Sequence, residues 1–254
     1  MTATVVAAGV PPVPSGVTAV AHVEVAVRAG ATAGPARTTL RLRSASPLVL
    51  RRTGPGRLHL VSVGAGPLGG DDLCLRVRVG ARARLAIIQV AAAVALPGPD
   101  GRPSRMRYEI ELGEHASLRW EGEPTVAGAG CDHASELHVT AAASACLSWR
   151  DEVVCGRHGE PSGVVRSRVT VVRAGRPALR TDACLGDAGW HSPAVGGGAR
   201  VAGTLLLLGA AAEQAAAVCS GHAAVLRPAD GVAVVTALGA GHPQVRAVLE
   251  AAGG

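Results

Sequence analysis

The sequence predicts a mainly β fold: a β-helical body of stacked strand-turn-strand coils, with two helices near the C-terminus. The first observation is strict alternation over residues 73–79, where leucine and valine point to one face while cysteine and arginine point to the other. The second is a repeat. Gly80 and Leu85 recur 33 residues later as Gly113 and Leu118, and Leu118 recurs 29 residues further on as Leu147. This regular spacing favours stacked coils over a sandwich.

The remaining elements follow from the same alternation, broken by glycine and proline. Besides residues 73–79, we expect strands at 19–28, 38–43, 48–52, 58–63, 81–87, 106–112, 116–120, 164–172, 178–185, 203–208, 225–227 and 232–238, and a third copy of the repeat at 134–154. Each repeat is interpreted as a hairpin whose apolar face is covered by the next coil. An alanine-rich helix is expected from Ala210 to Cys219, and a second from Pro243 to Gly253.

Two regions are predicted. Residues 1–17 contain Pro11, Pro12 and Pro14 without any period, so they are expected to form a loose N-terminal arm. Residues 18–254 are expected to form a single β domain, because all-β folds of this length are often one unit.

Composition narrows the class of protein. The chain is 48% apolar but has no Phe, three Trp and one Tyr, so the core must come from Val, Leu, Ile and Ala. The net charge of +6 comes from arginines that alternate along strands, which favours solvated strand faces over a nucleic-acid surface. Six scattered cysteines, no secretory leader and no apolar run of membrane length indicate a cytoplasmic protein with no membrane partner.

Local chemistry gives only weak signals. No nucleophile elbow, phosphate-binding loop or zinc-protease motif occurs. The segment from Asp151 to Glu160 is rich in ionisable groups that could hold a cation, but a polar turn in which Arg157 pairs with an acid is favoured. Adjacent Cys131, Asp132 and His133 cannot all reach one ion, because neighbouring strand residues face opposite ways.

Four motifs, in order and spacing, resemble the urease accessory protein D family. They are a glycine turn with Gly66, Gly69, Gly70 and Asp71; Gln89 with the small residues after it; Asp151 followed by Gly156, Arg157, Gly159 and Glu160; and a strand from Pro177 to Asp182. The resemblance covers about residues 38–254.

The resemblance implies a urease maturation chaperone that is not an enzyme. It implies a scaffold that binds accessory protein F and the GTPase accessory protein G, docks on apo-urease and passes nickel through an acid-lined channel. Nickel(II) would bind transiently, with no tightly held cofactor. Carried over by motif, the channel acids are Asp71, Asp151 and Asp182, with Asp72 and Glu152 as less certain neighbours.

Two alternatives from other classes stay open. One is a β-rich enzyme that uses the Asp151–Glu160 acids with Cys155 or His158. The other is a β-solenoid protein-binding module with no metal role.

Overall fold

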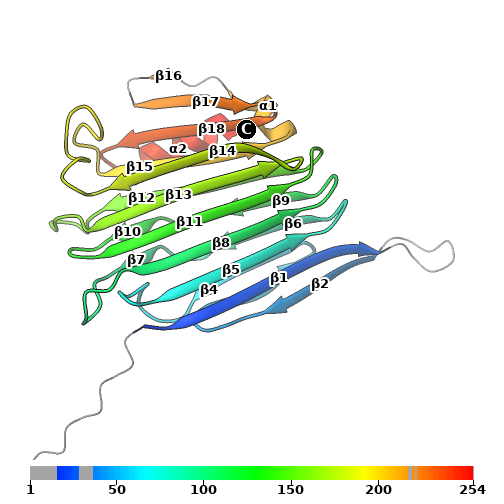
Figure 1. Ribbon diagram of the computed structural model, residues 1–254, viewed down its shortest axis with the longest axis horizontal. Helices are drawn as coiled ribbons and strands as arrows, with labels where there is room; N and C mark the ends of the chain where they lie inside the picture. Colours follow the sequence, from blue (N-terminus) through cyan, green and yellow to red (C-terminus); the bar gives the residue numbers. More distant parts are fainter. Residues whose placement is uncertain (1–15, 29–36, 217–218, 221, 254) are drawn as a thin grey trace, which may run out of the picture.

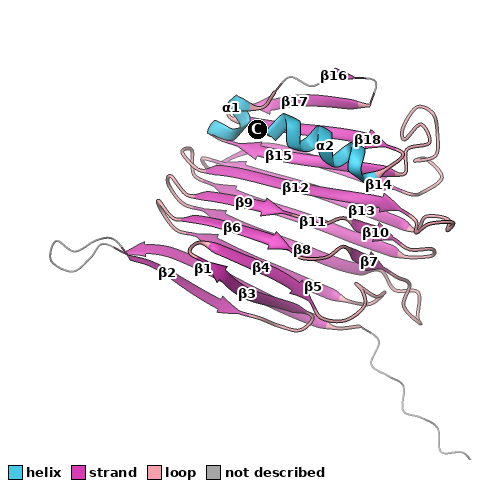
Figure 2. Ribbon diagram, turned by 180° about the vertical axis from the view of Figure 1, so that it is seen from behind, coloured by secondary structure: helices cyan, strands magenta, loops and turns pink. Residues whose placement is uncertain are grey.

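Two β-sheets face each other in the computed structural model, and the C-terminal helix lies across the outside of the larger sheet (Figures 1 and 2). The structure describes residues 16–28, 37–216, 219–220 and 222–253. The predicted arm therefore lies almost wholly outside the described residues, and the division into arm and single domain stays a prediction.

The smaller sheet has seven strands and the larger has eleven. In spatial order the seven-stranded sheet contains β14 (Arg176–Leu185), β13 (Val164–Arg173), β11 (Asp132–Ala141), β8 (Ser104–Leu112), β5 (Asp72–Val79), β1 (Thr18–Arg28) and β2 (Arg37–Arg43). The main path of the other contains β16 (Cys219–Ser220), β17 (Ala223–Ala229), β18 (Val232–Gly239), β15 (Val201–Leu208), β12 (Cys146–Cys155), β9 (Ser117–Glu121), β6 (Arg84–Gln89), β4 (Arg57–Ser62) and β3 (Leu48–Gly54). Two short strands, β7 (Ala93–Ala95) and β10 (Thr125–Ala127), pair beside this path.

The predicted repeat is confirmed residue by residue. Leu85 of β6 pairs with Leu118 of β9, and Leu118 pairs with Leu147 of β12. Trp120 and Trp149 are partners in the same ladder. All these pairings are parallel, as expected when one coil stacks on the next.

The interpretation of each repeat as a hairpin is wrong. β5 and β6 follow each other in sequence but lie in opposite sheets, so the turn at Gly80 is a corner between sheets. The same holds for β8 with β9 and for β11 with β12. Alternation alone cannot separate the two cases, because a hairpin and a corner both need two amphipathic strands around a short turn.

The second predicted helix is confirmed as α2 (His242–Gly253), which buries Val245, Leu249 and Ala252 against the outer face of the larger sheet. The first is much shorter than predicted. α1 (Ala210–Gln214) ends where Ala215 takes up an extended conformation, and Cys219 belongs to β16. Arg227 of β17 explains the early end, because its guanidinium binds the carbonyl oxygens of Ala212 and Ala215, the latter at 3.0 Å. Tertiary contacts thus override the helix propensity of alanine.

The core lies between the sheets and is built from small aliphatic side chains, as predicted. On the outer face of the seven-stranded sheet the arginines alternate with acids on the next strand. Arg76 lies 2.6 Å from Glu109, and Arg78 lies 2.6 Å from Glu111. These exposed pairs account for the arginine periodicity as a solvated strand face.

Candidate functional site

Two cavities lie in the space between the sheets, and they meet. The smaller, of about 50 Å³, is lined by Asp71, Gln89 and His133 among others, and reaches the loop at residues 64–67. The larger, of about 270 Å³, is lined by Asp151 and extends to the end strands β14 and β17. Tyr108 and Ser135 line both. The two cavities therefore follow one another along the stack of coils, and each has a carboxylate in its wall.

Asp71 is 6% exposed and fixes the glycine turn beside the smaller cavity. Its Oδ1 accepts a hydrogen bond from the Val17 amide at 2.8 Å, and its Oδ2 accepts one from the Leu68 amide at 2.9 Å. Each carboxylate oxygen keeps a further lone pair. Asp71 is therefore held rigidly while it still lines the cavity.

The glycines of this motif have a structural explanation. Gly70 has φ of +95°, a conformation that side chains rarely adopt. A Cβ on Gly69 would lie 2.3 Å from the Gly98 backbone nitrogen, so only glycine allows the two loops to touch. The motif thus holds Asp71 in place.

Gln89 and His133 complete the polar wall of the smaller cavity. Gln89 is 9% exposed, and its Nε2 donates to the Ala91 carbonyl oxygen at 3.1 Å. His133 is 2% exposed, with Nδ1 2.9 Å from the hydroxyl of fully buried Ser104. Burial lowers the pKa of His133 to about 4, so its imidazole is neutral at neutral pH.

Asp151 is the acid of the larger cavity. It belongs to a polar row across three neighbouring strands, in which Asp151 pairs with Thr204 and Thr204 pairs with Thr236. Ser135 and Ser167, also register partners, face this row from the other sheet. Burial raises the pKa of Asp151 to about 6, with a smaller contribution from the neighbouring Glu152 charge. The carboxyl is therefore mostly ionised at neutral pH.

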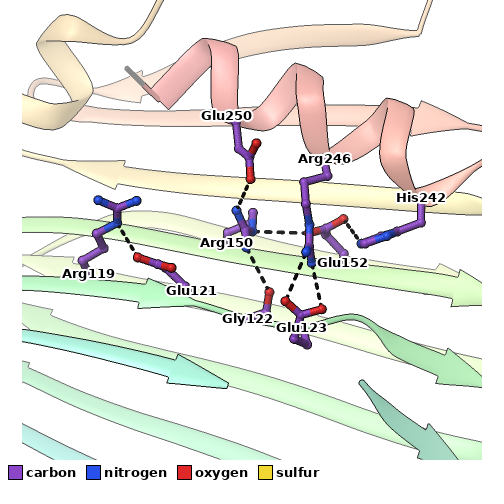
Figure 3. Close-up of polar contacts among 9 residues, drawn as sticks. All are labelled: Arg119, Glu121, Gly122, Glu123, Arg150, Glu152, His242, Arg246 and Glu250. Carbon is purple, nitrogen blue, oxygen red and sulfur yellow. Dashed lines mark hydrogen bonds and ion pairs between the residues drawn. The ribbon is translucent and has the colours of Figure 1, made fainter. Parts of the chain in front are cut away.

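Glu152 points the other way, towards α2 (Figure 3). It is 1% exposed, and its carboxylate lies 2.7 Å from His242 Nε2, 3.0 Å from Arg246 Nε and 3.3 Å from Arg150 Nε. The outer acids Glu123 and Glu250 complete this ion-pair cluster. Glu152 thus binds the helix to the sheet and does not line either cavity. Asp72 also lies away from both, 2.9 Å from Arg107.

Asp182 lies on the exposed face of β14, where its Oδ1 lies 2.5 Å from Arg168 Nε. The guanidinium of Arg168 lowers the pKa of Asp182. Arg168 belongs to the lining of the larger cavity, whereas Asp182 does not. Its place in a metal path stays a prediction, and nothing proposed below depends on it.

The other motif residues form the turn after β12. Gly156 and Gly159 have positive φ angles, and Arg157 pairs with Glu160 across the turn, as the sequence indicated. Arg200 closes the turn by donating to the Arg157 carbonyl oxygen at 3.0 Å.

The ionisable residues from 151 to 160 therefore do not form one catalytic pocket. Asp151 faces the interior, Glu152 faces α2, and Arg157 with Glu160 lies on the turn. Within the described ranges, no group of three or more His, Cys, Asp and Glu side chains could hold a metal ion. None of the helices that the structure describes is long and apolar enough to cross a membrane.

Sequence reasoning missed His133, Ser104 and Tyr108 as interior polar residues. The alternation of the strand predicts that Cys131, Asp132 and His133 do not share one metal ion. In the structure Asp132 pairs with Arg166 on the outside, while His133 faces inward. The alternation of the strands does contain a signal for these residues. Polar residues at positions where the alternation demands apolar ones mark the inner faces of β8, β11 and β12.

Comparison with known proteins agrees with the motif resemblance. A family model described as UreD urease accessory protein matches residues 17–253. The chain is 37% identical to Urease accessory protein UreD of Frankia casuarinae over 271 aligned residues, covering 85% of each chain. It is 38% identical to Urease accessory protein UreD 3 of Streptomyces griseus over 224 residues, covering 83% of this chain and 87% of the relative. The chain therefore belongs to the UreD family of urease accessory proteins.

Proposed function

We propose that this protein acts in urease maturation by conducting nickel(II) through the space between its two sheets. One observation carries the proposal: two carboxylates, Asp71 and Asp151, line adjoining cavities between two sheets whose inner faces are mainly apolar. Burying a carboxylate costs free energy that hydrogen bonds and countercharges offset. Asp71 accepts two backbone hydrogen bonds, but neither acid has an ion-pair partner among the described residues. A cation in transit would provide the missing countercharge.

The donor set suits transport better than storage. Carboxylate, amide and hydroxyl oxygens and one imidazole are acceptable to nickel but weaker together than a closed thiolate and imidazole site. Conduction requires binding that is favourable enough for entry and weak enough for release at each step. The oxygens of Asp71, Gln89, Ser135, Asp151 and Thr204 offer such a series.

The charged groups that line the two cavities are the carboxylates of Asp71 and Asp151 and the guanidinium of Arg168, which is paired with Asp182, so the field favours a cation over an anion. His133 is neutral at neutral pH because burial lowers its pKa to about 4, and Asp151 is mostly ionised. The low dielectric of the interior strengthens this field compared with the same charges in water.

The proposal extends to the partners that the family resemblance implies. The scaffold has no turnover of its own, holds nickel only transiently, works in the cytoplasm, and binds accessory protein F and the GTPase accessory protein G. Nickel leaves it for apo-urease. The smaller cavity reaches a loop at one side, and the larger reaches the end strands, so the route has two ends at which such partners could connect.

The experiment is urease activation in cells that lack this gene and carry a plasmid copy of it. Wild type is expected to restore activity, and Asp151→Asn to lower it at least tenfold at limiting nickel, because the amide has no charge to offset that of the ion. Asp132→Asn is the matched control: it is also an aspartate on a strand, but it pairs with Arg166 outside both cavities. Full activation by Asp151→Asn would contradict the proposal, and would leave a binding module without a metal role as the better account.

A further inference from the structure

Tyr108 occupies the junction of the two cavities. The smaller cavity has seventeen lining residues, of which only Tyr108 and Ser135 also line the larger. Tyr108 and Ser135 therefore lie between the Asp71 side and the Asp151 side of the interior.

The ring of Tyr108 bridges the two sheets at this junction. Tyr108 comes from β8, and Trp120 and Trp149 come from β9 and β12 in the opposite sheet. The Tyr108 ring meets Trp120 edge to face with centroids 5.2 Å apart, and Trp149 likewise at 4.9 Å. The two tryptophan rings stack at 4.4 Å.

This gathering of aromatic side chains is not expected by chance. The chain contains four aromatic residues in 254, three Trp and one Tyr, and three of the four meet here. The rest of this core cluster is aliphatic, and the fourth aromatic residue, Trp190, belongs to a separate cluster. A large, flat side chain therefore lies where the two cavities adjoin.

We infer that Tyr108 is the gate of the interior route, and that displacement of its ring limits the passage of a divalent cation from the smaller cavity to the larger one. The inference rests on the proposed function and adds its regulation. In the structure described here the ring partitions the interior. When the ring swings away from the tryptophans, Ser135 remains at the junction and offers a hydroxyl oxygen to the ion.

The barrier arises from the contacts that the ring must leave. Each edge-to-face aromatic contact adds modestly to the free energy of packing, and Tyr108 makes two. Apolar constrictions control conduction in channels in the same manner, by obstructing a hydrated ion. The hydroxyl is dispensable for this role, whereas the ring is essential.

Three variants test the gate in the same urease activation assay at limiting nickel, with the initial rate as the readout. Tyr108→Phe keeps the ring and removes the hydroxyl. Tyr108→Leu removes the ring while keeping an apolar side chain, which limits the cavity left in the core. Ile110→Ala is the matched control, because Ile110 lies on the same face of β8, is 2% exposed and lines neither cavity.

The gate predicts a rate about tenfold above wild type for Tyr108→Leu, and a wild-type rate for Tyr108→Phe. Structural damage would lower the initial rate of urease activation, as in Ile110→Ala or any poorly folded variant, whereas loss of the gate raises it. A Tyr108→Leu rate equal to or below that of Ile110→Ala overturns the inference, and so does a slow Tyr108→Phe, which would make the hydroxyl a ligand.

Acrylamide quenching of tryptophan emission gives a readout that does not depend on urease. In a Trp190→Phe background the emission comes from Trp120 and Trp149, the pair that Tyr108 covers. We expect quenching to increase severalfold in Tyr108→Leu and to stay at the parental level in Tyr108→Phe and Ile110→Ala. Unchanged quenching in Tyr108→Leu would show that the ring does not partition the interior.

The Asp151→Asn result distinguishes a failure of the gate from a failure of the proposed function. If Asp151→Asn abolishes activation and Tyr108→Leu behaves as Ile110→Ala, the route stands and the gate is wrong. If Asp151→Asn activates urease fully, the proposed function itself is wrong.

Discussion

Asp151 and Glu152 are consecutive on β12 and serve opposite faces of the sheet. Asp151 lines the cavity between the sheets, and Glu152 lies 3.0 Å from Arg246 of α2 on the outside. The alternation of a β-strand thus separates two neighbouring acids into an interior site and a helix anchor.

Glu152→Gln is expected to destabilise the fold by about 3 kcal/mol, because it leaves Arg150 and Arg246 beside a buried neutral group. Urea denaturation followed by circular dichroism measures this. Glu250→Gln is the control, since Glu250 also pairs with Arg150 but its side chain is 58% exposed, and such pairs contribute about 1 kcal/mol or less. Equal effects of the two substitutions would show that Glu152 does not anchor α2.

Asp151→Asn is expected to stabilise the metal-free protein by about 2 kcal/mol at pH 7.5, because a partly buried charge without an ion-pair partner among the described residues is removed. The sign follows from the raised pKa. Above about pH 6 the carboxyl is ionised in the folded and unfolded states alike, and its burial costs stability. As the pH falls from 6 towards 4, the folded state takes up the proton first and the cost disappears.

The measurement is the difference in the free energy of unfolding between Asp151→Asn and wild type across that range. It should shrink steadily below pH 6. A difference that is constant with pH would mean that Asp151 is not held in a desolvated environment.

His133 gives the opposite pH dependence. Its pKa falls from 6.5 to about 4 on folding, so the unfolded state binds a proton that the folded state refuses. Stability should therefore be lost as the pH falls from about 6.5 to 4, and His133→Gln should remove that part of the loss. His158→Gln, on the exposed turn after β12, should keep the wild-type profile. Identical profiles for His133→Gln and wild type would contradict the buried, neutral imidazole.

Gly69→Ala is expected to cost about 2 kcal/mol, because the new methyl group would lie 2.3 Å from the Gly98 nitrogen. Gly54→Ala is the control, as the nearest atom to its Cβ is 3.8 Å away in the Arg57 side chain. Thermal unfolding of both variants tests whether the glycine motif holds the Asp71 turn. If Gly69→Ala were as stable as Gly54→Ala, the close approach of the two loops would be wrong.

Much of the fold could be predicted because stacking copies the sequence repeat directly into register. The 33-residue offset from Leu85 to Leu118 and the 29-residue offset to Leu147 became ladder partners. The predictions that were wrong, the hairpins and the length of the first helix, concern features that depend on long-range contacts. The sequence cannot show that the turn at Gly80 joins different sheets, nor that Arg227 binds the last carbonyls of α1.

The candidate site was only partly predictable for the same reason. Asp71 and Asp151 came from family motifs, and both line the interior. Their connection depends on Tyr108 of β8 and Ser135 of β11, which come from different coils and meet only after stacking. Asp182 lies beside Arg168 on an exposed face, and its place in a metal path stays a prediction.

Nickel-edge anomalous diffraction from crystals of this protein soaked with nickel(II) tests the central claim most directly. The account predicts an anomalous peak between the sheets, within coordination distance of the Asp151 carboxylate, that is lost in Asp151→Asn. Peaks confined to outer histidines such as His158, with none between the sheets, would contradict it.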